Sequence, residues 1–248
     1  CSNTEGESNT AVGRLSLACN TTADSNTALG YATLRCVVTN GDNTAVGTLA
    51  LNRSTASNST AVGACALRCN TTGTDNTAMG ACALNLNSSG AFNSAFGYRS
   101  LDSSTTASSN TAVGFHSMCK TTTGNNSTAV GFCALGNNTT GATNNAFGHS
   151  ALELNTTGDF NVAVGNKALE ANTTADFNTA LGACSLICNQ TGAKNVAVGF
   201  SSLFNNVGDQ NTAVGFCALL ANTSGADNVS VGRNALDANT TANYNTAV

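Results

Sequence analysis

A unit of 17 residues recurs along the whole chain, and this repeat constrains the fold more than any other feature of the sequence. One copy reads NTAVGTLAL at 43–51. The Gly of this motif returns every 17 residues, with two steps of 16, at Gly13, Gly30, Gly47, Gly63, Gly80, Gly97, Gly114, Gly131, Gly148, Gly165, Gly182, Gly199, Gly215 and Gly232. A fixed period this short indicates a repeat architecture, in which each unit is stabilised by stacking on its neighbours.

The unit can be written N-T-A-V-G-x-x-A-L-x-x-N-T-T-G-x-x, with Asn at position 1. Position 9 is Leu in every unit except for Met118, position 4 is always a large apolar residue, and position 3 is Ala apart from Ser230. Gly and the N-T-T-G segment interrupt each half of the unit, and a two-helix repeat needs about 30 residues or more, so helices are excluded. We expect two short strands, at positions 2–4 and 7–9, with positions 2, 4, 7 and 9 facing inward.

Stacked copies of this unit predict an all-β fold, a parallel β-solenoid or β-roll of about 15 coils with a 17-residue period, as one continuous array over 1–248. The array has no capping segment and begins and ends within a repeat, so we expect it to continue in a longer chain or on another copy. Asn occupies position 1 in most units, and we expect these side chains to form an internal hydrogen-bonded ladder without a ligand.

Units such as NTAVGTLAL (43–51) and NTALGYATL (26–34) resemble the head repeats of YadA-like trimeric autotransporter adhesins and related β-roll repeats of phage and viral tail fibres. The resemblance covers essentially the whole chain. It implies a left-handed parallel β-roll, with three chains side by side, that projects from a cell or virion surface. The adhesin head unit is shorter than this one, and those heads are not rich in Cys.

The 11 cysteines fall on positions 7, 10 and 11 of the unit. Equivalent positions in adjacent coils lie about 5 Å apart, within the span of a disulfide. The spacing nominates Cys19–Cys36 and Cys65–Cys82, and also Cys119–Cys133 and Cys184–Cys188. Free thiols that pack as small core residues are the alternative.

Position 12 begins an Asn-x-Ser/Thr pattern in nine units, and this pattern is an acceptor for N-linked glycans. The residues are Asn20, Asn70, Asn87, Asn138, Asn155, Asn172, Asn189, Asn222 and Asn239. The N-T-T-G segment is also a favourable turn in its own right, which explains the pattern without any sugar.

Catalytic and metal-binding patterns are missing from the sequence. His116 and His149 are isolated, no C-x-x-C occurs, and the Asp residues near the end of the unit come at most one per coil. We therefore expect no enzyme activity, no metal and no cofactor. The net charge is −4 without a basic patch, and no apolar run of membrane length occurs, so we expect neither nucleic acid binding nor a membrane span.

Aromatic residues share position 6 in six units, at Tyr31, Tyr98, Phe115, Phe132, Phe200 and Phe216. They are interpreted either as corner fillers or as a contact stripe for a partner chain or carbohydrate.

These features favour a structural segment of an extracellular fibre or filament, N-glycosylated and stabilised by disulfides. It would self-associate end to end as a filament or laterally as a homotrimer. One alternative is an adhesin or viral-fibre shaft or head that binds a host surface. A second is ice binding by the Thr-Thr pairs at positions 13 and 14, such as Thr21-Thr22 and Thr71-Thr72.

Overall fold

The structure is a computed structural model that describes residues 3–248. These residues form fifteen short strands and contain no helix, so no helix in them could cross a membrane. The chain divides into two compact units, Cys1–Asn125 and Asn126–Val248. The first unit contains β1 (Thr10–Val12), β2 (Thr27–Leu29), β3 (Thr44–Val46), β4 (Thr60–Val62), β5 (Thr77–Met79), β6 (Ser94–Phe96) and β7 (Thr111–Val113). The second contains β8 (Thr128–Val130), β9 (Asn145–Phe147), β10 (Val162–Val164), β11 (Thr179–Leu181), β12 (Val196–Val198), β13 (Thr212–Val214), β14 (Val229–Val231) and β15 (Thr246–Ala247).

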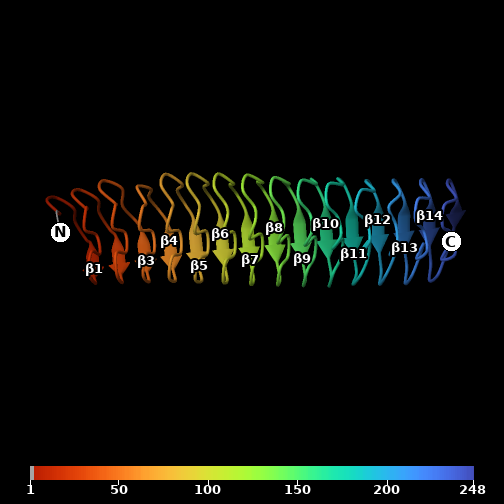
Figure 1. The fold of residues 1–248 in the computed structure, drawn as a ribbon, viewed down its shortest axis with the longest axis horizontal. Helices are drawn as coiled ribbons and strands as arrows, with labels where there is room; N and C mark the ends of the chain where they lie inside the picture. Colours follow the sequence, from red (N-terminus) through yellow and green to blue (C-terminus); the bar gives the residue numbers. More distant parts are fainter. Residues whose placement is uncertain (1–2) are drawn as a thin grey trace. The chain divides into compact units, whose positions relative to one another are not determined.

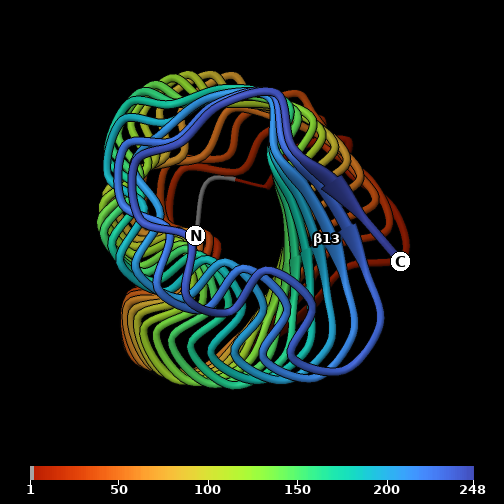
Figure 2. The same ribbon diagram turned by 90° about the vertical axis from the view of Figure 1, so that its right-hand side faces the viewer.

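Within each unit the strands pair in parallel and in sequence order, which confirms the all-β parallel solenoid with a 17-residue period (Figure 1). Within each unit, position 3 of one coil pairs with position 3 of the next, as Ala28 does with Ala45. The 16-residue step between Gly47 and Gly63 keeps this register, because the missing residue falls in the loop and Ala45 still pairs with Ala61. Figure 2 shows the strand on one side of each coil and irregular segments that complete the turn.

The prediction of which side chains face inward is wrong for the strand. Ala163 at position 3 is fully buried, whereas its neighbours Val162 and Val164 at positions 2 and 4 face outward. Successive side chains in a strand point to opposite faces, so burial of the Ala row forces the larger residues out. The interior is completed by the Leu of position 9, which is buried as predicted: Leu51 and Leu67 are both fully buried, and the N–H of Leu51 donates to Ala66 at 3.0 Å.

The second predicted strand, at positions 7–9, does not form. Positions 6–11 are a turn segment in which positions 7 and 9 adopt left-handed backbone conformations, for example Lys167 at φ 58° and Leu169 at φ 52°. An extended strand cannot contain such residues. The segment still bonds to its neighbours, since the N–H of Leu152 donates to Ala168 at 3.0 Å. Gly165 at position 5 has φ 138° and begins the turn, a conformation that favours glycine.

Two columns of Asn side chains run through the interior of each unit, and the ladder predicted at position 1 is confirmed. Asn93 is fully buried, and its Nδ2 donates to Oδ1 of Asn76 at 3.1 Å and to the carbonyl of Ala107 at 2.8 Å. The second column is position 12, where Nδ2 of Asn87 donates to Oδ1 of Asn70 at 2.8 Å. These side-chain amides hydrogen-bond to one another and to buried loop carbonyls, which have no partner in a β-sheet.

Candidate functional site

The outward face of the strands is the most continuous surface feature of each unit. We call it the TAV face and define it by the residues at positions 2 and 4. Position 2 holds Thr10, Thr27, Thr44, Thr60, Thr77, Ser94, Thr111, Thr128, Asn145, Val162, Thr179, Val196, Thr212, Val229 and Thr246. Position 4 holds Val12, Leu29, Val46, Val62, Met79, Phe96, Val113, Val130, Phe147, Val164, Leu181, Val198, Val214, Val231 and Val248. Neither row contains a charged residue.

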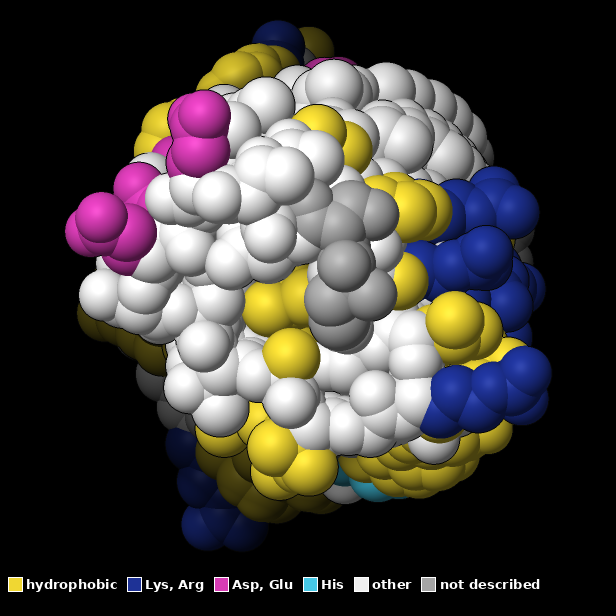
Figure 3. Space-filling model, turned by 90° about the vertical axis from the view of Figure 1, so that its left-hand side faces the viewer, with side chains coloured by type: hydrophobic (Ala, Val, Ile, Leu, Met, Phe, Trp, Pro, Cys, Tyr) yellow, Lys and Arg dark blue, Asp and Glu magenta, His cyan; other side chains and the backbone are white. Residues whose placement is uncertain are grey.

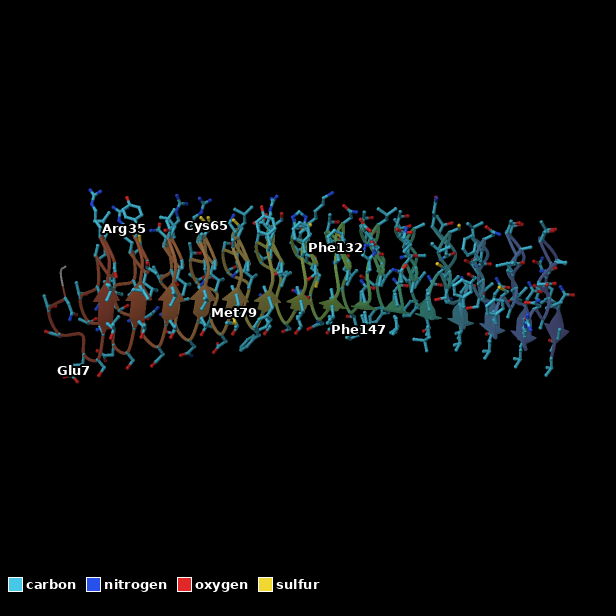
Figure 4. The ribbon with its side chains drawn as sticks, turned by 90° about the horizontal axis from the view of Figure 1, so that it is seen from below. Glu7, Arg35, Cys65, Met79, Phe132 and Phe147 are labelled. Carbon is cyan, nitrogen blue, oxygen red and sulfur yellow. The ribbon has the colours of Figure 1, made fainter. Side chains whose placement is uncertain are left out.

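The apolar side chains of position 4 remain substantially open to solvent. Met79 of the first unit is 43% exposed, and Phe147 and Val164 of the second are each 40% exposed. Figure 4 shows Met79 beside the strands of its unit and Phe147 beside those of the other. The parallel pairing brings each row into line along the unit, so that Phe147 is aligned with Val164 and Val164 with Leu181. An exposed apolar row of this regularity is a feature of interaction surfaces.

The sequence contains a signal for this face in the sizes of its residues. The Ala row at position 3 has nearly constant volume, whereas position 4 varies from Val to Phe. Identical coils enclose the same interior space, so an inward row must keep its volume, because overpacking a close-packed interior is destabilising. Variable size at position 4 therefore indicates the outward face.

The aromatic side chains of position 6 are half-exposed and stack on one another between coils. The rings of Tyr98 and Phe115 lie 5.4 Å apart at 21°, and those of Phe200 and Phe216 lie 5.4 Å apart at 16°. Phe160 and Phe177 form a similar pair at position 17, with centroids 5.1 Å apart. Much of each ring face is thus covered by the next ring.

The predicted disulfides are not present. None of the ten cysteines in the described part of the chain forms a disulfide, including the nominated Cys19, Cys36, Cys65, Cys82, Cys119, Cys133, Cys184 and Cys188. Cys1 lies outside the described residues. Neighbouring positions in a stacked solenoid come within reach of each other whatever residue occupies them, so proximity alone does not specify a bond. Burial raises the thiol pKa of Cys119 above its ordinary value, against the lowering effect of Lys120 and Arg99.

The structure does not support glycosylation of the Asn residues at position 12. The prediction needed an exposed corner, but eight of the nine are buried: Asn20, Asn70, Asn87, Asn138, Asn155, Asn172, Asn189 and Asn222. Nδ2 of Asn172 donates one hydrogen to Oδ1 of Asn155 at 2.8 Å and the other to the carbonyl of Ala175 at 3.1 Å. A glycan replaces one of these hydrogens and would break the ladder. Asn239 is half-buried, and its Nδ2 also makes two hydrogen bonds.

The Thr-Thr pairs of positions 13 and 14 are partly engaged by the coil itself. The hydroxyl of Thr71 donates to the carbonyl of Ser88 at 2.7 Å, and that of Thr156 to the carbonyl of Thr173 at 3.0 Å. A Thr hydroxyl has one hydrogen to donate, and one that donates it to the next coil cannot donate it to an ice surface. This geometry therefore does not favour the ice-binding alternative.

No cluster of three or more His, Cys, Asp or Glu side chains suited to a metal ion occurs in residues 3–248. The imidazole of His116 stacks on Phe115 at 4.2 Å, and that of His149 stacks on Phe132 at 5.1 Å. Both histidines are thus held against aromatic neighbours. No family model matches the chain, and no curated protein matches its sequence.

Proposed function

We propose that this chain is a structural segment of an extracellular fibre or filament, and that its copies associate side by side through the TAV face. The observation that carries the proposal is the uncharged apolar row at position 4, which recurs in every coil of both units and whose side chains are exposed or half-buried. Placement at a cell or virion surface and a homotrimeric arrangement draw their support from the resemblance to adhesin heads and tail fibres.

The area of the TAV face in each unit can be compared with that of a standard interface. A three-residue strand is about 10 Å long and each coil adds about 4.8 Å, so one coil presents roughly 50 Å². The seven strands of the first unit then present roughly 350 Å² and the eight strands of the second roughly 400 Å². Each is about half of the roughly 800 Å² per partner of a standard interface, so a stable association needs contacts by both units. Covering the exposed part of each position 4 side chain would contribute on the order of 1 kcal/mol before the costs of association.

The repeat also favours association that is uniform along the unit. The same pair of rows recurs at every coil, so two copies in lateral contact would make equivalent contacts at each step rather than at a single anchor. The Thr hydroxyls of position 2 can hydrogen-bond across such an interface or retain water. A segment that gains its contacts evenly along its length is suited to stiffness and length rather than to recognition of one small ligand.

The mass of the assembled protein tests the proposal. The triple variant Phe147→Lys, Val164→Lys and Leu181→Lys places charges on three adjacent coils of the TAV face. The control Thr140→Lys, Thr157→Lys and Thr174→Lys places the same charges on three adjacent coils at exposed turn residues. We expect wild type and control to sediment as the same oligomer and the face variant to sediment as a monomer, with circular dichroism to verify folding. A monomeric wild type, or a folded face variant of unchanged mass, would contradict the proposal.

A further inference from the structure

The charged residues of the first unit are divided between two edges of the coils. The turn segments at positions 6–11 carry six cations, Arg14, Arg35, Arg53, Arg68, Arg99 and Lys120, and one carboxylate, Asp102. The loops at positions 12–17 carry five carboxylates, Glu5, Glu7, Asp24, Asp42 and Asp75, and no cation. In Figure 4 Arg35 and Glu7 lie on opposite sides of the unit, and Figure 3 shows basic and acidic side chains gathered on opposite sides. We call the six cations the basic edge.

Contacts between coils bring several members of the basic edge close together. The N–H of Arg53 donates to the carbonyl of Arg68 at 3.2 Å, and the carbonyl of Arg35 accepts from Cys19 of the preceding coil at 3.1 Å. Arg68 and Arg99 both act electrostatically on the thiol of Cys82, which lies in the coil between them. The cations therefore come one per coil, from positions 6, 7, 10 and 11 of the turn segment, with a gap only at residues 81–86. The expectation that the chain has no basic patch is thus wrong for this unit.

Half of these cations are not neutralised by an ion pair. Arg99 pairs with Asp102 at 2.7 Å. Arg14, Arg35 and Arg53 are exposed and form no ion pair within residues 3–248. A row of like charges about 4.8 Å apart raises the cost of folding unless counterions or an anionic ligand gather along it.

The second unit provides an internal comparison. Its turn segments carry Lys167 and Arg233 against Glu153, Glu170 and Asp237, which leaves a net charge of one negative where the first unit has five positive. Lys167 is also paired with Glu170 at 3.1 Å. The basic edge is therefore not a consequence of the repeat, because the same positions in the same fold carry the opposite sign in the second unit.

We propose that the basic edge binds a linear anionic polysaccharide with a carboxylate on each sugar, such as a polyuronate. The match is one of charge and rise, because the edge presents about one cation per coil and an extended pyranose chain advances by about the same distance per sugar. Successive sugars turn about the chain axis, so the carboxylates that face the edge would pair with the long cationic side chains and the others would remain in solvent. The edge lies apart from the TAV face, since it belongs to the turns and not to the strands, so this proposal does not depend on lateral association.

Nucleic acids fit the edge less well. A nucleic acid strand in a duplex carries a phosphate about every 3.4 Å and winds away from a straight row of cations. Single strands are held by stacking of bases on open aromatic faces. Near this edge Tyr98 stacks on Phe115 at 5.4 Å and Phe115 on His116 at 4.2 Å, so these rings offer mainly their edges to a base. Tyr31 is 46% exposed between Arg14 and Thr48 of the adjacent coils, and a single ring cannot stack a run of bases.

Binding of polygalacturonate oligomers to the full chain tests the proposal, with two variants that remove three cations each. One is Arg14→Gln, Arg35→Gln and Arg53→Gln on the basic edge. The other is Lys167→Gln, Lys194→Gln and Arg233→Gln in the second unit, which changes the net charge of −4 by the same amount. At low ionic strength we expect the edge variant to lose affinity about tenfold or more and the matched control about twofold or less, with wild-type affinity falling steeply as salt is added.

An oligodeoxythymidylate with the same total charge serves as the competing ligand, and circular dichroism verifies the fold of both variants. Tighter binding of the oligonucleotide than of the polyuronate would assign the edge to nucleic acid and overturn the proposal. Equal losses in the two variants would show attraction to overall charge without a site. Absence of polyuronate binding by the wild type would also refute it.

Discussion

Substitutions at the adjacent residues 163 and 164 test directly which side chains of the strand face the interior. In β10 Ala163 is fully buried between Ala146 and Ala180 of the adjacent coils, whereas Val164 is 40% exposed. Ala163→Val adds two carbon atoms to a close-packed interior whose neighbours cannot withdraw. Val164→Thr exchanges one methyl group for a hydroxyl on the outward side, where water can reach it.

The two substitutions differ in expected cost. Overpacking a core position by one or two carbons costs about 1–3 kcal/mol, so we expect Ala163→Val to lower the free energy of unfolding by that amount. A surface substitution at a half-exposed site is usually within about 0.5 kcal/mol, and we expect Val164→Thr to fall in this range. Urea unfolding followed by far-UV circular dichroism measures both, with wild type in parallel.

The opposite order of effects would refute the reasoning. If position 4 faced inward, Val164→Thr would bury a hydroxyl without a partner at a cost of about 1–3 kcal/mol. Ala163→Val would then place its two added methyl groups in solvent. A tolerated Ala163→Val together with a destabilising Val164→Thr would therefore restore the arrangement expected from the sequence.

Two further predictions concern the turn and the thiols. Gly165→Ala is expected to destabilise the protein by several kcal/mol, because Gly165 has φ 138° and an added Cβ would lie 2.6 Å from the carbonyl carbon of Gly182. Gly136→Ala is the control in the same unfolding assay, because other coils carry larger residues at this position. Equal losses of stability in the two variants would exclude the backbone conformation of Gly165 as the cause. Alkylation of Cys119 by iodoacetamide is expected to reach its half-maximal rate at a higher pH in the folded protein than in the urea-unfolded chain, because burial raises the thiol pKa and leaves less thiolate at any given pH. Peptide mass spectrometry after timed quenching measures the alkylation rate, and coincident pH profiles of the folded and unfolded chain would contradict the prediction.

The sequence by itself determined the period, the parallel stacking and the Leu column. These features follow from spacing, since a 17-residue step with Gly at the same place brings equivalent residues into register whatever the loops do. Leu51 over Leu67 and the internal Asn ladder of position 1 were both predictable for this reason. Repetition alone excluded helices and required neighbours to stabilise each coil.

Only the tertiary structure decided which row of the strand faces inward and how the second half of the coil is formed. Alternation along a strand defines two faces but not which of them is enclosed, and a narrow coil has room for Ala163 and not for Val164. Leu169 adopts a left-handed conformation that Leu rarely takes, because the buried Leu column and the hydrogen bonds between coils outweigh the local backbone preference. The basic edge likewise depends on folding, since its cations are separated by 15 to 31 residues in the chain and become neighbours only when the coils stack.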